Sequence, residues 1–179
     1  MARRFHLLLA AVALATPTLR ADASAGPHFS VKTPRTAPEL TGISHWINSN
    51  PIQLASLRGK VVLVDFWTFG CINCQRTLPY VKQWYAKYHD QGFEIIGVHT
   101  PELSYERSLA NVRAAVTKLG ITYPVAIDPA FATWNAYANQ YWPAEYFLDK
   151  RGRIRHYVEG EGGYTNTPKV IEALLAEPA

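Results

Sequence analysis

Two nearly continuous apolar runs lie in the middle of the chain. Residues 60–67 read KVVLVDFW, and residues 93–100 read FEIIGVHT. Nearly continuous runs of β-branched and aromatic residues are typical of strands buried on both faces of a sheet. A similar run over 144–148 predicts a third main strand, and 153–158 predicts a strand that returns from the turn after it. A short extra strand is predicted over 123–128.

An amphipathic helix is predicted directly after the first of these strands. Apolar side chains recur there at spacings of three and four residues, at Cys74, Leu78, Val81, Trp84, Tyr85 and Tyr88. Polar side chains occupy the opposite face, so the pattern predicts a helix that begins near Cys71 and ends near Gly92. Pro79 lies inside this helix and is expected to kink it.

Three further helices are predicted, over residues 104–119, 131–138 and 167–176. Thr167 is expected to cap the last of them, with Pro168 at its first position.

The order of these elements predicts an α/β fold. Ahead of the first main strand, residues 46–48 and 52–57 are expected to pair as a small N-terminal hairpin. The order β-α-β-α, followed by an inserted strand and short helix, a β-hairpin and a last helix, predicts a central mixed sheet flanked by helices on both faces.

The first 23 residues have the pattern of a secretory signal peptide. Arg3 and Arg4 give a basic start, residues 5–15 are almost wholly apolar, and residues 21–23 read ADA. This order matches the three regions of a signal peptide, and the apolar run is shorter than the ~20 residues that span a bilayer. We expect cleavage after Ala23, with an uncleaved anchor or an amphipathic helix as alternatives.

The rest of the chain divides into an arm and one domain. Residues 24–40 contain several prolines and few large apolar side chains, which predicts a linker or extended arm. Residues 41–177 are long enough to form a single domain with its own core.

Charge gives no support for nucleic-acid binding. The chain has 18 basic and 14 acidic residues, a net charge of +4. Residues 1–23 hold three arginines and one aspartate, so their removal leaves 15 basic and 13 acidic residues and a net charge of +2. No basic stripe is present in the sequence, and we expect no nucleic-acid partner.

The sequence contains two cysteines, which are Cys71 and Cys74, separated by Ile72 and Asn73. A disulfide that closes so short a ring stabilises a fold by only ~2 kcal/mol, so redox chemistry explains the pair better than structural bridging. The predicted helix N-terminus favours a thiolate at Cys71. We expect Cys71 to attack a substrate disulfide and Cys74 to resolve the mixed disulfide. A zinc half-site is the alternative, but zinc requires four ligands.

These residues carry a family resemblance. The segment 64–67 (VDFW), followed by Cys71-x-x-Cys74 and Pro79, resembles the thioredoxin superfamily, and residues 57–64 resemble its TlpA/ResA-like branch. Closer similarity is to the thioredoxin-like domain of DipZ proteins, in the segments CINC (71–74), GVHTPE (97–102), YWPAEY (141–146) and GEGGY (160–164). The resemblance covers roughly residues 38–175 and implies a thioredoxin-like fold and an exported thiol-disulfide oxidoreductase.

Asp65 is a charged residue in the middle of an apolar strand. Burial without a partner would raise the pKa of its carboxyl group, unless a lysine pairs with it. The resemblance implies that Asp65 lies behind Cys74 and assists its proton transfer.

The resemblance also assigns roles to two further residues. Pro143 is implied to be the cis-proline that faces the cysteines and presents backbone groups to an extended substrate, with Trp142 beside it as a contact surface or a core residue. Glu102 aligns with an acidic residue near the disulfide of ResA-like proteins. The alternative is a solvent-exposed loop glutamate without a role in the site. Glu145 begins the strand near the predicted site, and either pairs with an arginine or tunes the thiols.

Two other functions compete with this hypothesis. Thr68-x-x-Cys71 fits half of the peroxiredoxin motif for peroxide reduction, but Val64 stands where that motif has proline. A copper-binding carrier on a thioredoxin fold is the second, and such carriers usually have a longer cysteine spacing and a distal histidine. The sequence predicts no cofactor and no metal site.

Partners follow from the resemblance. DipZ proteins carry a membrane electron-transfer domain that this sequence does not include, so we expect a separate membrane protein of the CcdA type to supply electrons. The expected clients are exported proteins with cysteine thiols or disulfides, including those of cytochrome c maturation, in the periplasm. Ile72-Asn73 leaves the direction of electron flow open, because the intervening residues help to set the reduction potential.

Overall fold

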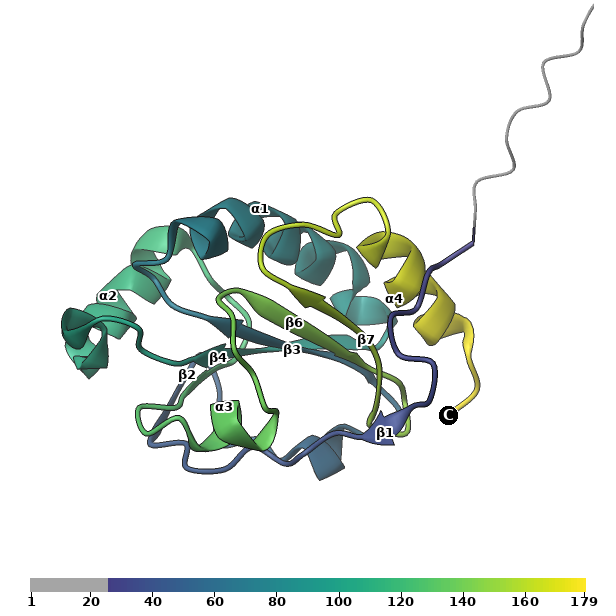
Figure 1. The fold of residues 1–179 in the computed structure, drawn as a ribbon, viewed down its shortest axis with the longest axis horizontal. Helices are drawn as coiled ribbons and strands as arrows, with labels where there is room; N and C mark the ends of the chain where they lie inside the picture. Colours follow the sequence, from purple (N-terminus) through teal and green to yellow (C-terminus); the bar gives the residue numbers. More distant parts are fainter. Residues whose placement is uncertain (1–25) are drawn as a thin grey trace, which may run out of the picture.

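A seven-stranded mixed sheet runs through the protein in the computed structural model, which describes residues 26–179 (Figure 1). Its strand order is β1-β7-β6-β3-β4-β5-β2. The strands are β1 (Arg35–Thr36), β2 (His45–Ile47), β3 (Val61–Trp67), β4 (Phe93–His99), β5 (Val125–Ile127), β6 (Ala144–Leu148) and β7 (Arg153–Glu159). The predicted signal peptide lies outside the described residues.

Strand β3 forms the centre of the sheet, parallel to β4 and antiparallel to β6. All seven of its residues are buried, as the continuous apolar run predicts for a strand covered on both faces. Successive side chains of a strand point to opposite faces, so Leu63 and Asp65 share one face while Val64 and Phe66 share the other.

Helices cover both faces of the sheet. They are α1 (Ile72–Tyr88), α2 (Leu109–Leu119), α3 (Ala132–Ala136) and α4 (Thr167–Ala176). Helices α1, α2 and α4 pack on the face that carries Leu63, and α3 packs on the opposite face against Phe66 (Figure 1). The fold class and the inserted strand and helix, β5 and α3, are confirmed.

The predicted N-terminal hairpin is wrong. Strand β2 pairs antiparallel with β5 at the sheet edge, and Leu54–Leu57 form a 3₁₀ helix instead of a partner strand. The reason is tertiary: the amide of Asn48 donates to the carbonyls of Ile121 and Tyr123, 2.9 and 3.1 Å away, which holds the end of β2 beside the segment that leads into β5.

The predicted helix over 104–119 is interrupted. A 3₁₀ helix, Ser104–Arg107, comes first, and α2 begins only at Leu109 because Ser108 adopts an extended backbone and caps it. The serine hydroxyl accepts a hydrogen bond from the Asn111 amide at 3.4 Å.

Helix α4 has the predicted bounds but not the predicted cap. Asn166, not Thr167, is the N-cap residue. Its side chain makes no capping bond because it exchanges two hydrogen bonds with the backbone of His28 in the N-terminal arm, at 2.9 and 2.8 Å.

The described part of the predicted arm is extended and lies along the sheet. Ser30 hydrogen-bonds to His156 and Tyr157, and the two residues of β1 pair with β7. Between residues 26 and 179, no helix combines the length and apolar character needed to cross a membrane.

Candidate active site

Cys71 lies at the junction of the central strand and the first helix. Strand β3 ends at Trp67, and Cys71 is the N-cap of α1, with an extended backbone. Its half-buried sulfur accepts a hydrogen bond from the Cys74 amide at 3.3 Å and donates one to the Trp142 carbonyl at 3.7 Å. The helix N-terminus thus directs a backbone N–H at this sulfur, which favours a negative charge on it.

Cys74 lies one turn further along α1 and is buried, only 5% exposed. Both cysteines are free thiols. Burial raises the pKa of the Cys74 thiol, and its hydrogen bond with Cys71 raises it further. Cys74 is therefore a protonated thiol at neutral pH, and it needs a base before it can act as a nucleophile.

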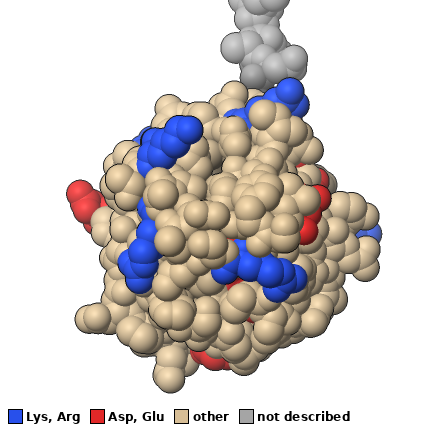
Figure 2. All heavy atoms as spheres, turned by 90° about the vertical axis from the view of Figure 1, so that its left-hand side faces the viewer, with Lys and Arg blue, Asp and Glu red and all other residues tan. Residues whose placement is uncertain are grey.

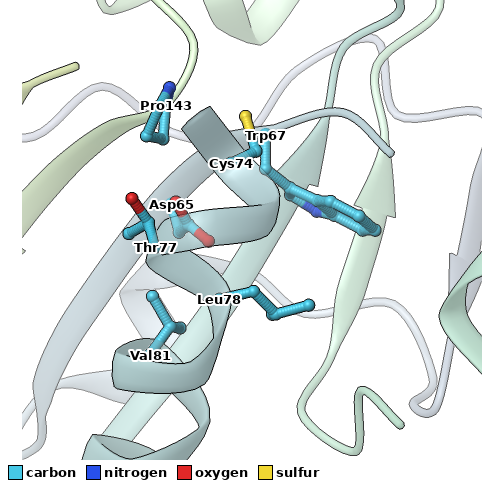
Figure 3. Close-up of a pocket in the computed structure, with 7 residues that line it drawn as sticks. All are labelled: Asp65, Trp67, Cys74, Thr77, Leu78, Val81 and Pro143. Atoms are coloured by element: carbon cyan, nitrogen blue, oxygen red, sulfur yellow. The ribbon is translucent and has the colours of Figure 1, made fainter. Parts of the chain in front are cut away.

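A small cavity lies beside Cys74 (Figure 3). Its lining residues come from β3, α1 and the segment before β6: Asp65, Trp67, Cys74, Thr77, Leu78, Val81 and Pro143. Its volume of about 10 Å³ is close to the space that one water needs. The cavity brings the Asp65 carboxyl and the Cys74 thiol to one place, as the resemblance implied.

Asp65 is buried, and its Oδ1 has no hydrogen-bond partner among the described residues. Burial raises the pKa of this carboxyl from 3.8 to about 7. The direction agrees with the sequence-based expectation, and no ion pair of Asp65 with a lysine is found in the described part of the chain. A carboxyl group that titrates near neutral pH is suited to accept and return a proton.

A second buried carboxyl lies beside Asp65. Glu145 is the register partner of Asp65 across the β3–β6 pair, and it is only 1% exposed. Neither of its oxygens has a hydrogen-bond partner among residues 26–179, so the arginine pairing considered from the sequence is not found there. Burial raises the pKa of Glu145 well above its usual value, and the charge of Asp65 raises it further.

Pro143 and Trp142 form the opposite wall of the site. The Trp142–Pro143 peptide bond is cis, and Pro143 lines the cavity with Cys74. The indole N–H of Trp142 donates to the Thr100 carbonyl at 3.0 Å, and its ring packs on Trp134 with the ring centroids 4.0 Å apart. Trp142 is thus held in place while its carbonyl contacts Cys71.

Glu102 and Glu106 have different environments. Glu102 is exposed, and its backbone N–H donates a hydrogen bond to Glu106 Oε2 at 2.8 Å. The buried acid of this loop is Glu106, which also accepts hydrogen bonds from the backbone amides of Gly70 and Leu103, both at 2.7 Å. The sequence did not identify Glu106, because nothing in residues 104–107 (SYER) distinguishes a buried glutamate from an exposed one.

Thr68 and His99 form a buried polar pair behind the loop. Thr68 Oγ1 and His99 Nε2 are 3.2 Å apart, and the Phe69 ring stacks on the imidazole. Burial lowers the pKa of His99 to about 4, so the imidazole is neutral at physiological pH. In the described part of the chain, no three His, Cys, Asp or Glu side chains are grouped so that they can hold a metal ion.

The charged side chains at this end of the molecule are scattered. Figure 2 shows the end of the molecule where β3 ends and α1 begins, and acidic and basic side chains are scattered over this face without forming a patch. Four large apolar side chains near the site are 45–58% exposed: Ile72, Leu103, Tyr105 and Tyr141.

Comparisons with known proteins show the family of this chain. Residues 27–157 match the model of the AhpC/TSA family. The chain is 52% identical over 143 residues to Protein DipZ of Mycobacterium tuberculosis, covering 78% of this chain but only 21% of DipZ, so it spans about a fifth of that relative.

A second relative matches along its whole length. Thiol-disulfide oxidoreductase YkuV of Bacillus subtilis is 31% identical over 147 residues, which cover 82% of this chain and 99% of YkuV. The solution structure of a thioredoxin-like protein in the oxidized form has a TM-score of 0.74 and 31% identity, covering 83% of this chain and 100% of that one. The chain therefore belongs to the AhpC/TSA family and, within it, to the thioredoxin-like thiol-disulfide oxidoreductases.

Proposed function

We propose that this protein exchanges thiols and disulfides with client proteins through Cys71 and Cys74. The observation that carries the proposal is the contrast between the two sulfurs. Cys71 is partly exposed at a helix N-terminus with a backbone N–H directed at it, while Cys74 is buried above the carboxyl of Asp65. An accessible attacking thiol and a protected resolving thiol are what a two-step exchange requires.

The first step is attack by the Cys71 thiolate on a client disulfide. A bond forms between Cys71 and one client sulfur, and the other client sulfur leaves as a thiolate. In the second step Asp65 accepts the proton of Cys74, whose sulfur attacks Cys71 and releases the client thiol. The result is one reduced client and a Cys71–Cys74 disulfide, which an external dithiol must reduce before the next cycle.

Client binding is proposed along the wall formed by Trp142 and Pro143. The Trp142 carbonyl lies beside the Cys71 sulfur, so a client segment that approaches this sulfur passes the backbone of this wall. The exposed apolar side chains and the absence of a charged patch on this face support recognition through backbone and apolar contacts.

Export and electron supply are part of the proposal. Residues 1–23 act as a cleaved signal peptide, and the mature domain works in the periplasm on exported proteins with cysteine thiols or disulfides. The protein reduces its clients, which include the cysteines of cytochrome c maturation. A membrane protein of the CcdA type supplies the electrons. The sequence pattern of the N-terminus and the similarity to DipZ support this assignment.

Trapping of the mixed disulfide tests the order of the two cysteines. Cys74→Ala should accumulate a covalent Cys71–client adduct, because the resolving thiol is absent, whereas Cys71→Ala should trap no client at that position. The adducts are counted by non-reducing electrophoresis and mass spectrometry with a model disulfide peptide. Equal trapping by both variants, or by neither, would refute the assignment.

Peroxide reduction is the second candidate function, because the matching family model and the Thr68-x-x-Cys71 spacing both favour it. The burial of Thr68 and its hydrogen bond to His99 oppose that reaction, since the hydroxyl is engaged in the core. Consumption of hydrogen peroxide with dithiothreitol as reductant, measured beside disulfide reduction, separates the two functions.

A further inference from the structure

Asp65 has two cross-strand neighbours, and they differ sharply. In β4 its register partner is Gly97, which has no side chain, and in β6 its partner is Glu145. Directly opposed residues of an antiparallel pair have their Cβ atoms about 4.5–5.5 Å apart, which brings two carboxyl groups within reach of each other. Side chains two residues apart in a strand share a face, so Asp65 and Glu145 lie on the same sheet face as Leu63 and Phe147, which α1 covers. Figure 3 shows Asp65 behind this helix.

This pair of carboxyl groups is buried. Oδ1 of Asp65 and both oxygens of Glu145 lack a hydrogen-bond partner within the described residues. The titratable groups that face the pair are Cys74 of α1, Tyr123 ahead of β5 and Tyr164 ahead of α4, and all three are uncharged when protonated.

Tyr123 shows how closely these groups lie together. Its ring packs over Gly97, where an added Cβ would be 3.0 Å from Tyr123 Cε2. Burial raises the pKa of its hydroxyl, and the charges of Asp65, Glu145 and Cys74 act in the same direction.

Two carboxylates cannot both stay ionised in such a site, because repulsion and the loss of water solvation act against the second charge. We propose that Glu145 is a positioning residue that shares one proton with Asp65, so that the pair presents a single negative charge to Cys74. The inference rests on the proposed function of Asp65 as the base for Cys74, and it adds the group that fixes the protonation state of that base.

The shared proton leaves the chemistry of the resolving step balanced. The proton of Cys74 moves to the Asp65 carboxylate, and the electron pair of the Cys74 sulfur forms the bond to Cys71. The bond between Cys71 and the client sulfur breaks, and that sulfur leaves with its electron pair and takes a proton from water. Glu145 keeps its proton throughout, and the pair, now with two protons, returns one to solvent before the next cycle.

Carboxyl-carbon NMR of the reduced protein, labelled at aspartate and glutamate carboxyls, measures the coupling without any client. In the wild-type protein Asp65 and Glu145 should titrate in two separate steps, with Asp65 near pH 7 and Glu145 well above the usual range of a glutamate. In Asp65→Asn the midpoint of Glu145 should fall by at least one pH unit, a tenfold loss of proton affinity, because the neighbouring charge is gone. In Glu145→Gln the upper step should disappear while Asp65 still titrates.

Glu94 is the internal control. It is a buried carboxyl of β4 that pairs with Lys60 at 3.6 Å, and neither substitution should change the chemical shift of its carboxyl carbon at pH 7. The rate of the resolving step, followed by client release from the mixed disulfide against pH, supplies the functional readout. Its profile should keep the lower inflection and lose the upper one in Glu145→Gln.

An unchanged Glu145 midpoint in Asp65→Asn would overturn the inference, and this measurement stands even if Glu145→Gln fails to fold. Failure of the proposed function has a different signature. If Asp65→Asn leaves the resolving rate unchanged at every pH while the two carboxyls still titrate as a pair, Asp65 is not the base and only the coupling survives.

Discussion

A buried carboxyl without a partner carries a stability cost that depends on pH. The pKa of Asp65 is raised by burial from 3.8 to about 7, so between these values the folded protein keeps a proton that the unfolded chain releases. Stability therefore falls as pH rises through this window and levels off above it. The difference corresponds to about 4 kcal/mol at most, at 1.36 kcal/mol per pKa unit.

Asp65→Asn should consequently stabilise the protein at pH 8, by up to about 4 kcal/mol, and leave stability at pH 3.5 nearly unchanged. Urea unfolding of the two proteins at several pH values measures this. If Asp65→Asn raised the free energy of unfolding equally at pH 3.5 and at pH 8, the stabilisation would not be electrostatic in origin.

Asp149→Asn is the matched control of opposite sign. Burial acts to raise the pKa of Asp149, but the hydrogen bonds and charge of Arg153 and Arg155 outweigh it and hold the pKa below its ordinary value. The stability that this carboxylate contributes is present above the unfolded pKa and is lost as pH falls. Asp149→Asn should therefore destabilise the protein at pH 8 and approach the wild type in acid.

At the scale of elements, one side chain joins the loop before α1 to the loop after β4. The Glu106 carboxylate accepts three backbone hydrogen bonds, from Gly70, Glu102 and Leu103. Gly70 directly precedes Cys71, and a Cβ at this position would collide with Glu106 Oε1. The position of the attacking sulfur thus depends on an acid 35 residues further along the chain.

Glu106→Gln should lower the free energy of unfolding by about 2 kcal/mol and slow the attack of Cys71 on a disulfide, since an amide N–H₂ cannot accept the bonds that a carboxylate oxygen accepts. Glu102→Gln is the control, and its exposed side chain predicts a stability change within about 0.5 kcal/mol. Unfolding curves and single-turnover rates of both variants decide the matter. Slower turnover in Glu102→Gln, with no change in Glu106→Gln, would show that Glu102 is the acid on which the reaction depends, as the family resemblance implied.

Elements were predictable where the local pattern decides them. The apolar runs of β3 and β6, the amphipathic spacing of α1 and the proline at the start of α4 suffice to place these elements, and the cysteine spacing suffices to propose the redox pair. Strand β2 was mispaired because its partner is selected by Asn48 contacts more than 70 residues away. Glu145 was found in the sequence, but its proximity to Asp65 depends on strand register, which a shift of one residue would reverse.

At the scale of the whole molecule, the open question is the direction of electron flow. The chain covers 21% of DipZ and 99% of YkuV, so the family contains both fused and separate forms of this domain. In the separate form, the reduction potential of the Cys71–Cys74 couple decides which partners can donate electrons and which can receive them.

The structure favours a reducing couple. A dithiol becomes a strong oxidant when its reduced form is stabilised, as in DsbA at ~−120 mV, whereas thioredoxin lies at ~−270 mV. Burial raises the pKa of Cys74, and the Asp65 charge acts the same way, so Cys74 does not stabilise the reduced form as a thiolate. Within the described residues, the stabilisation of a thiolate at Cys71 comes from the one backbone N–H that is directed at its sulfur. We expect a potential nearer that of thioredoxin, measured by equilibration with dithiothreitol redox buffers and alkylation of the free thiols. A value near ~−120 mV would reverse the proposed direction and make the protein an oxidant of its clients.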